Sequence, residues 1–151
     1  MDVMLLSRRQ LSMEEREELR TQLIGHRAQR ALWFQTRAVK LFGPAGGIMA
    51  RQLLFWATRG HDQEGWVYKS RREMEMETGL TRRPQETARK VLKAHGVLEE
   101  VKRPVGPMKR QTMHYRLDLV QLLDLLQKLS DKGWNPEEND PDRNVYDPSA
   151  R

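Results

Sequence analysis

The fold is decided by residues 78–96, TGLTRRPQETARKVLKAHG, which predict two helices joined by a tight turn. Gly79 lacks a Cβ and can adopt the positive φ that ends the first helix. Leu80 is expected to turn inward as the plug of the turn. The hydroxyl of Thr81 is expected to cap the second helix. The two helices should therefore be joined by a turn of only three residues, 79–81.

The second helix is expected to run from about Arg82 to His95. Pro84 is tolerated in its first turn, where an N–H has no intrahelical partner, and Gly96 ends it. Helical spacing makes a narrow apolar stripe of Ala88, Val91, Leu92 and His95. The remaining surface is mostly cationic and carries Arg82, Arg83, Gln85, Glu86, Arg89, Lys90 and Lys93. One face of this helix should pack and the other should face solvent or a ligand.

A cationic helix face beside a tight turn suits a helix that lies in a DNA major groove. There Arg and Lys contact phosphates and guanine edges, and Gln can reach adenine. A solvated surface helix would carry the same charges. The distribution of charge favours the nucleic acid, because residues 69–116 hold 13 Lys/Arg against 6 Asp/Glu, whereas residues 131–151 have a net charge of −3.

Length and composition limit the remaining choices. With 151 residues the chain suits one compact domain with terminal extensions. No segment has the length and apolarity of a membrane span, since charged residues interrupt the most apolar run, Leu117–Leu129. The first residues lack the pattern of a signal peptide. The absence of cysteine excludes disulfides and thiolate chemistry and fits a cytoplasmic protein.

Residues 1–43 are predicted to form an N-terminal helical arm. Ser12 and Glu15 have the spacing of a capping box, and apolar residues follow at helical spacing. The arm can pack on the domain or serve in dimerisation, and both alternatives are open. Its later aromatic residues, Trp33 and Phe34, are expected in the core. Residues 43–47, GPAGG, predict a loop before a strongly apolar helix at residues 48–56.

A short strand is expected at residues 66–68, with both aromatic rings, Trp66 and Tyr68, buried. Ser70 and Glu73 form a second capping box, which opens a helix that continues to Thr78. Met74 is expected to be its inward residue. At this helix start Ser70, Arg71 and Arg72 are candidate phosphate contacts.

Two strands are predicted at residues 97–103 and 112–117. Between them, residues 104–111 are rich in Pro and Gly and are expected to form a long loop rather than a tight turn. This loop is the tip of a β-hairpin wing, and its Lys109 and Arg110 can reach phosphate or the minor groove. A mobile surface loop with two unrelated cations is the alternative.

Asp118 is expected to cap a last helix, whose leucine stripe lies within residues 119–129. The stripe is wide enough to cover the core and also to meet a second copy in a homodimer. The chain then becomes polar and acidic, so residues 131–151 are predicted to be a flexible tail. The domain organisation is therefore an arm at 1–43, a domain at 44–130 and a tail at 131–151.

This order of elements, mainly α with a small β-hairpin, is that of a winged helix-turn-helix with an N-terminal helical arm and a C-terminal helix. The segments IMARQLLFW (48–56), GWVYKS (65–70), ETGLTRR (77–83), ETARK (86–90) and HYRLD (114–118) resemble the winged-helix domain of bacteriophage and prophage replication-initiation proteins and their small helix-turn-helix relatives. The resemblance covers residues 30 to 126. It implies a protein that binds DNA in the cytoplasm of a bacterium or a phage-infected cell. The short tail fits a small regulator or an accessory replication factor better than a helicase loader.

The predicted function is binding of double-stranded DNA through a recognition helix at 82–95 and a basic wing at 104–111. The candidate contacts are Ser70, Arg71, Arg72, Thr81, Arg82, Arg83, Gln85, Glu86, Arg89, Lys90, Lys93, Lys109 and Arg110. A protein-interaction module without specific DNA binding is the rival interpretation. An RNA binder is less favoured, because the basic surface is expected to lack stacking aromatic rings.

No enzymatic activity, metal or cofactor is expected. The four histidines, His26, His61, His95 and His114, lie in different predicted elements, and no phosphate-binding loop or nucleophile motif occurs.

Overall fold

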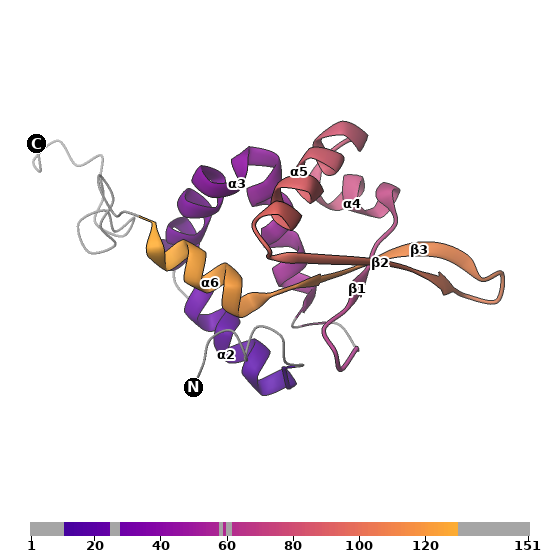
Figure 1. The fold of residues 1–151 in the computed structure, drawn as a ribbon, viewed down its shortest axis with the longest axis horizontal. Helices are drawn as coiled ribbons and strands as arrows, with labels where there is room; N and C mark the ends of the chain where they lie inside the picture. The colour runs from indigo at the N-terminus through magenta and orange to yellow at the C-terminus, as the bar shows by residue number, and fades with distance from the viewer. Residues whose placement is uncertain (1–10, 25–27, 58, 60–61, 130–151) are drawn as a thin grey trace, which may run out of the picture.

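The computed structural model describes residues 11–24, 28–57, 59 and 62–129. The elements within these ranges are α2 (Met13–Ile24), α3 (Ala28–Ala57), β1 (Val67–Tyr68), α4 (Arg71–Thr78), α5 (Arg82–Ala94), β2 (Leu98–Val105), β3 (Arg110–Leu117) and α6 (Leu119–Lys128). The described part is mainly helical with a small antiparallel sheet, which confirms the expected α+β class (Figure 1). None of its helices is long and apolar enough to cross a membrane.

The sheet has the strand order β1-β3-β2, and both pairs are antiparallel. β2 and β3 form a hairpin that projects beyond the helices in Figure 1. Its pairing extends to Val105 and Arg110, so the connection is only the tip at residues 106–109. The long loop predicted at 104–111 was wrong. Gly106, with φ 77°, and Lys109, with φ 50°, supply the left-handed backbone that a tight turn requires.

The loop predicted at residues 43–47 was also wrong, because α3 continues through it with a single kink. Gly43 alone leaves helical geometry, with φ 78° and ψ 172°. Pro44 follows in the first turn of the second half, where its missing N–H has no intrahelical partner. The kink lets α3 bend while both halves stay packed: Phe42 lies before it and Met49 after it, and both are buried.

One hydrophobic cluster crosses the boundary predicted at residue 43. From the arm it includes Leu23, Trp33 and Phe34, which confirms the expectation for the two aromatic residues. The arm is also fixed through the buried Arg16, whose guanidinium donates to the Gln63 carbonyl at 2.7 Å. The described arm therefore packs on the domain.

The leucine stripe of α6 joins the same core. Leu119, Leu122, Leu123 and Leu126 are buried, and α6 packs against α2 and α3. Asp118 caps the helix as predicted, because its carboxylate accepts a hydrogen bond from the Gln121 N–H at 2.9 Å. Most of the apolar face that could have met a second copy is thus covered within the chain, and Leu125 is only partly buried. The predicted tail at 131–151 lies outside the described residues.

The turn between α4 and α5 follows the sequence prediction in most respects. Gly79 ends α4 with φ 79°, Leu80 is buried, and Ser70 and Glu73 form both bonds of the capping box. Thr81 occupies the N-cap position of α5, but its side chain makes no capping hydrogen bond. The predicted role of the Thr81 hydroxyl was therefore wrong, and this side chain is exposed.

Candidate nucleic-acid interface

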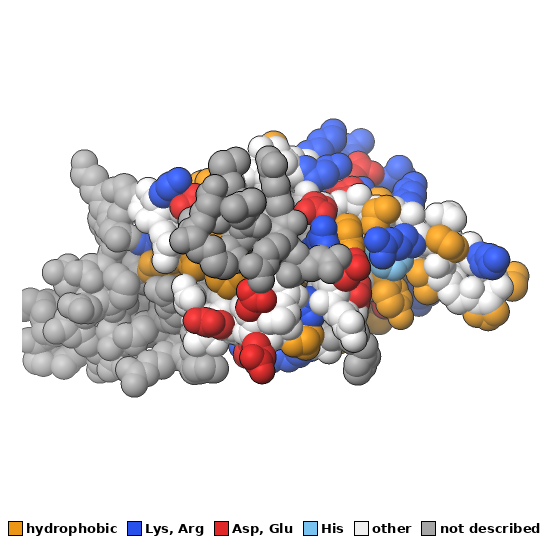
Figure 2. Space-filling view, turned by 60° about the horizontal axis from the view of Figure 1, so that its bottom comes forward, with side chains coloured by type: hydrophobic (Ala, Val, Ile, Leu, Met, Phe, Trp, Pro, Cys, Tyr) orange, Lys and Arg blue, Asp and Glu red, His pale blue; other side chains and the backbone are white. Residues whose placement is uncertain are grey.

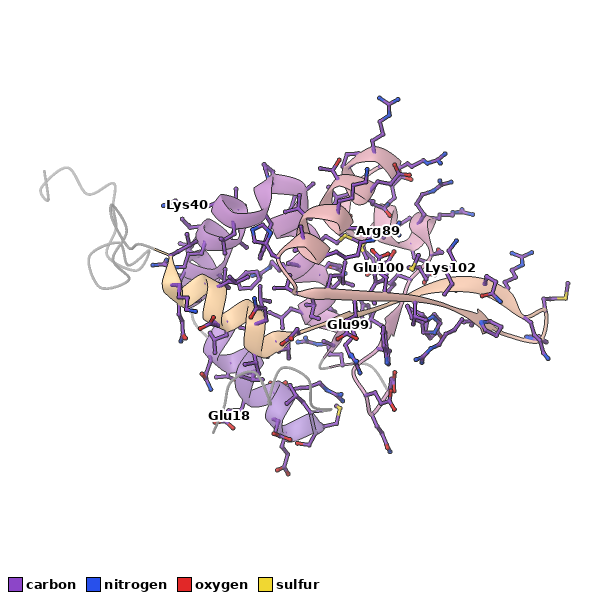
Figure 3. The ribbon with its side chains drawn as sticks, in the orientation of Figure 1. Glu18, Lys40, Arg89, Glu99, Glu100 and Lys102 are labelled. Atoms are coloured by element: carbon purple, nitrogen blue, oxygen red, sulfur yellow. The ribbon has the colours of Figure 1, made fainter. Side chains whose placement is uncertain are left out.

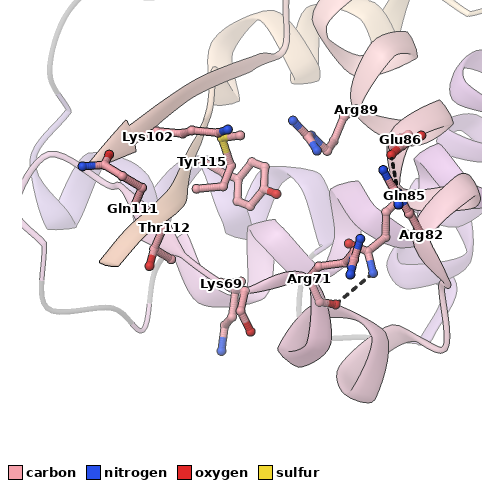
Figure 4. Close-up of a pocket in the computed structure, with 12 residues that line it drawn as sticks. Lys69, Arg71, Arg82, Gln85, Glu86, Arg89, Lys102, Gln111, Thr112 and Tyr115 are labelled. Atoms are coloured by element: carbon pink, nitrogen blue, oxygen red, sulfur yellow. Dashed lines mark hydrogen bonds and ion pairs between the residues drawn. The ribbon is translucent and has the colours of Figure 1, made fainter. Parts of the chain in front are cut away.

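A groove of about 310 Å³ separates α5 from the β2–β3 hairpin. Figure 4 shows side chains from the start of α4, from α5 and from both long strands directed into it. The groove is lined by Lys69, Ser70, Arg71, Arg82, Gln85, Glu86, Arg89, Lys102, Gln111, Thr112, Met113 and Tyr115. Five of these side chains are cationic and one is anionic, so the groove suits an anionic ligand. It brings together predicted residues from α4 and α5 with residues of the hairpin.

Arg89 is a partly buried cation of the groove, and it is paired with a carboxylate. Its guanidinium contacts both carboxylate oxygens of Glu100 on β2, at 2.8 and 2.9 Å. Lys93 approaches the same carboxylate at 3.4 Å. Hydrogen bonds from Arg89 lower the pKa of Glu100 against the opposing effect of burial. Figure 3 shows Arg89 and Glu100 on the same side of the sheet. Arg89 was predicted to face the DNA, but the ion pair makes it mainly a link between α5 and β2.

Arg82 is also paired, although it lies at the surface. Its Nε contacts Glu86 at 3.0 Å, one helical turn away, and the Arg82 side chain is 70% exposed. This hydrogen bond lowers the pKa of Glu86. Both residues line the groove between α5 and the hairpin. An exposed pair of this kind exchanges partners at little cost in free energy, so Arg82 can release Glu86 for a phosphate.

The prediction that Gln85 reads bases was wrong. Gln85 is only 3% exposed. Its amide Nε2 donates to the carbonyl of Leu80 at 2.7 Å and to the carbonyl of Arg71 at 3.0 Å. Gln85 therefore ties α5 to the turn and to the start of α4 through two backbone carbonyls.

The long sides of α5 differ in how their cations are engaged. We call Arg82, Arg89 and Lys93 the paired edge, because each contacts a carboxylate. We call Arg83 and Lys90 the open edge, because these two exposed cations have no ion-pair partner among the described residues. The spacing of seven residues places Arg83 and Lys90 on one line of the helix.

Other predicted cations are exposed in the same way. Arg71 and Arg72 lie at the start of α4, and Lys109 and Arg110 lie at the hairpin tip, without an ion-pair partner in the described ranges. Ser70 lines the groove, but its hydroxyl accepts the capping bond from Glu73. It can still donate to a phosphate.

The Glu77 carboxylate on α4 makes several contacts that hold α4 next to α3. Glu77 accepts hydrogen bonds from Gln52 and from the Trp56 indole, each at 2.6 Å, and it contacts Lys69 at 2.7 Å. Burial acts to raise the pKa of Glu77, but these three hydrogen bonds together lower it. Lys69 also lies 3.9 Å from the Trp56 ring centroid. These contacts of Glu77 hold Lys69 in place in the lining of the groove.

Sequence reasoning missed Lys102 and Lys69 at this site. Lys102 lies on β2, exposed, and lines the groove with Gln111 from β3. Its signal was present, because the alternation of a strand puts Lys102 on the same side as Glu100. Lys69 could not be assigned without knowing that Glu77 holds it.

No family model, curated protein or solved structure matches this chain. The chemistry of the groove is therefore derived from the residues of the chain itself. Those residues form a basic, concave surface between a helix and a projecting hairpin.

Proposed function

We propose that this protein is a winged helix-turn-helix protein that binds double-stranded DNA, with α5 in the major groove and the hairpin tip on the flanking backbone or minor groove. The observation that carries the proposal is the groove, in which cations from α4, α5 and β2 converge, on a helix that also exposes Arg83 and Lys90. A duplex presents phosphates on both sides of the major groove. A protein whose cations flank a projecting helix matches that arrangement.

The contacts divide by their role. Arg83 and Lys90 on the open edge have freely exposed side chains and are the proposed readers of base edges. Arg71, Arg72, Lys102, Lys109 and Arg110 are the proposed phosphate contacts, which position the protein without reading sequence. Arg89 supports the site by fixing the spacing between α5 and β2 through Glu100.

The length of the chain and the resemblance of its segments suggest a small regulator or an accessory replication factor. A protein-interaction module is the rival function. Its favoured surface would have been the leucine face of α6, but that face is buried against α2 and α3. This burial weighs against the interaction module.

Selection from a random duplex library tests the proposal. The purified full chain is incubated with the library at physiological salt, bound duplexes are sequenced, and the affinity of the best site is measured over a salt series. A specific reader should prefer one site over random duplex by at least about 10³-fold, and its affinity should fall as salt rises. A protein that enriches no site and binds every duplex only at about 10⁻⁴–10⁻⁶ M would support the interaction module instead.

A further inference from the structure

The sheet has a second side, which faces away from α5. Strand alternation puts Leu98, Glu100 and Lys102 of β2 on the side of α5, and Glu99 and Arg103 on the other. Figure 3 shows Glu99 and Glu100 on opposite sides of the strand. We call this second side the outer face. By the same alternation it is built from Trp66, Tyr68, Glu99, Val101, Arg103, Arg110, Thr112, His114 and Arg116.

Tyr68 on the outer face is exposed, and the expectation that its ring is buried was wrong. The residue is 55% exposed, although it lies within β1 opposite His114 of β3. The rings of Tyr68 and His114 lie 5.4 Å apart between centroids and are inclined by 36°. The His114 ring is held in turn, because its Nδ1 lies 2.9 Å from the Thr112 carbonyl. Tyr68 therefore offers a supported aromatic ring to solvent.

Two arginines lie over the neighbouring aromatic ring. The guanidinium carbons of Arg116 and Arg103 lie 4.5 and 4.9 Å from the ring centroid of Trp66. Glu99 contacts Arg116 at 2.7 Å, whereas Arg103 is exposed and has no ion-pair partner in the described part. Figure 2 shows hydrophobic, basic and histidine side chains next to one another beside the hairpin. The outer face thus combines stacking rings with cations.

We propose that the outer face binds single-stranded nucleic acid, with an unpaired base stacked on Tyr68 and the backbone contacting Arg103. Every nucleobase has a π-face, so an exposed ring binds bases with little dependence on sequence. Guanidinium planes also stack on bases and contact phosphates. Three arginines against one glutamate give this side a positive charge that suits a polyanion. An acidic peptide would match the charge but would leave the exposed Tyr68 ring without a stacking partner.

This site is separate from the groove proposed for the duplex. Tyr68 and Arg103, which carry the proposal, do not line the groove, whereas Thr112 borders both sites. The open edge of α5 lies on the other side of the sheet. The two sites can therefore fail independently. A protein with both could hold a duplex on one side and an unpaired strand on the other.

Fluorescence anisotropy titrations of the full chain test the proposal. They measure its affinity for labelled 20-nucleotide oligo(dT), for 20-nucleotide oligo(U) and for a 20-base-pair duplex. Tyr68→Ala should weaken oligo(dT) binding by roughly 5- to 100-fold and leave duplex binding within about 2-fold. Tyr68→Phe should keep the wild-type affinity because it keeps the ring. Tyr68→Leu should behave like Tyr68→Ala, because it keeps apolar area but removes the π-face. If Tyr68→Ala loses the same affinity for oligo(dT) as for oligo(U), the site recognises base and phosphate alone. If the variant loses more affinity for oligo(U), the site is assigned to RNA.

Arg83→Ala with Lys90→Ala provides the matched control on the other side of the sheet. It should keep oligonucleotide binding and lose duplex binding, which separates failure of this inference from failure of the proposed function. Circular dichroism and thermal unfolding check that each variant is folded. The inference is overturned if Tyr68→Ala and Tyr68→Leu bind oligo(dT) and oligo(U) as the wild type does. It is also overturned if they lose duplex and oligonucleotide affinity in equal measure.

Discussion

The paired edge and the open edge of α5 both carry Arg and Lys, but these cations differ in whether a carboxylate binds them. On the paired edge, Arg82, Arg89 and Lys93 contact the carboxylates of Glu86 and Glu100. On the open edge, Arg83 and Lys90 have no such partner among the described residues. The comparison teaches that a cationic helix face is not a uniform ligand surface. A partly buried cation such as Arg89 that is bound to an acid stabilises the fold, whereas an exposed pair such as Arg82–Glu86 adds little, and an unpaired cation is fully available to a phosphate or a base.

The largest effect is expected from removing the open edge. Arg83→Ala with Lys90→Ala should weaken duplex binding by about 2–4 kcal/mol, because each side chain is a proposed DNA contact. The free energy of unfolding should change by no more than about 0.5 kcal/mol, since both residues are exposed. Binding is measured by anisotropy and unfolding by urea titration. Arg82→Ala with Lys93→Ala is the matched control on the paired edge. If the control lost more DNA affinity than the open-edge variant, the assignment of the two edges would be reversed.

Arg89→Met should act mainly on stability. The Glu100 side chain is 10% exposed and would keep only the weaker Lys93 contact. Loss of a partner from a buried ion pair costs 3–5 kcal/mol, and we expect about 2 kcal/mol here because the Arg89 side chain is 26% exposed. Urea titration measures the change. The double variant with Glu100→Gln should recover part of the loss, and simple additivity of the two changes would contradict the coupling.

Gln85→Leu should have a smaller effect and lower the free energy of unfolding by about 1–2 kcal/mol. The hydrogen bonds to the carbonyls of Arg71 and Leu80 are lost, while the side-chain volume stays similar. Base preference should not change, since Gln85 is buried. Selection of duplexes by the variant checks this second point. A shift in the preferred bases would restore Gln85 as a reader.

The smallest effect concerns pH. The folded pKa of Glu100 is lowered, so its ion pair stabilises the fold fully above the ordinary glutamate pKa of 4.5 and loses this effect as the pH falls through the lowered value. Glu100→Gln should therefore lose stability less steeply than the wild type below about pH 4.5. Thermal unfolding from pH 7 to pH 3 measures both slopes. Parallel profiles would show that the carboxylate of Glu100 is not held in the folded state.

Features that depend on neighbouring residues in the sequence were predictable. The capping box at Ser70, the left-handed Gly79 and the buried Leu80 each follow from a few adjacent residues and were confirmed. The class of fold followed in the same way, from the periods of apolar residues. The backbone at Gly43 was harder, because a Gly-Pro pair fits a loop and a kinked helix equally well, and only the packing of Phe42 and Met49 decides between them.

The candidate site was predictable in its location and not in its detail. Gln85 and Tyr68 were misassigned and the ion pair of Arg89 was not predicted, because the neighbours of these residues come from distant parts of the chain. Gln85 donates to the Arg71 carbonyl, Arg89 pairs with Glu100 on β2, and Tyr68 is exposed on β1. Residue type alone does not tell whether a polar side chain is bound within the protein or free.

The packing of α2 against α6 has a consequence for how the protein is made. These are the first and last helices of the described chain, and their apolar residues share one core. A ribosome synthesises the end of α2 more than a hundred residues before the end of α6. The nascent arm therefore has no complete surface to pack on during that interval. The core closes only after Lys128 has left the exit tunnel. Until then the apolar residues of the arm lack part of the core that covers them in the folded protein.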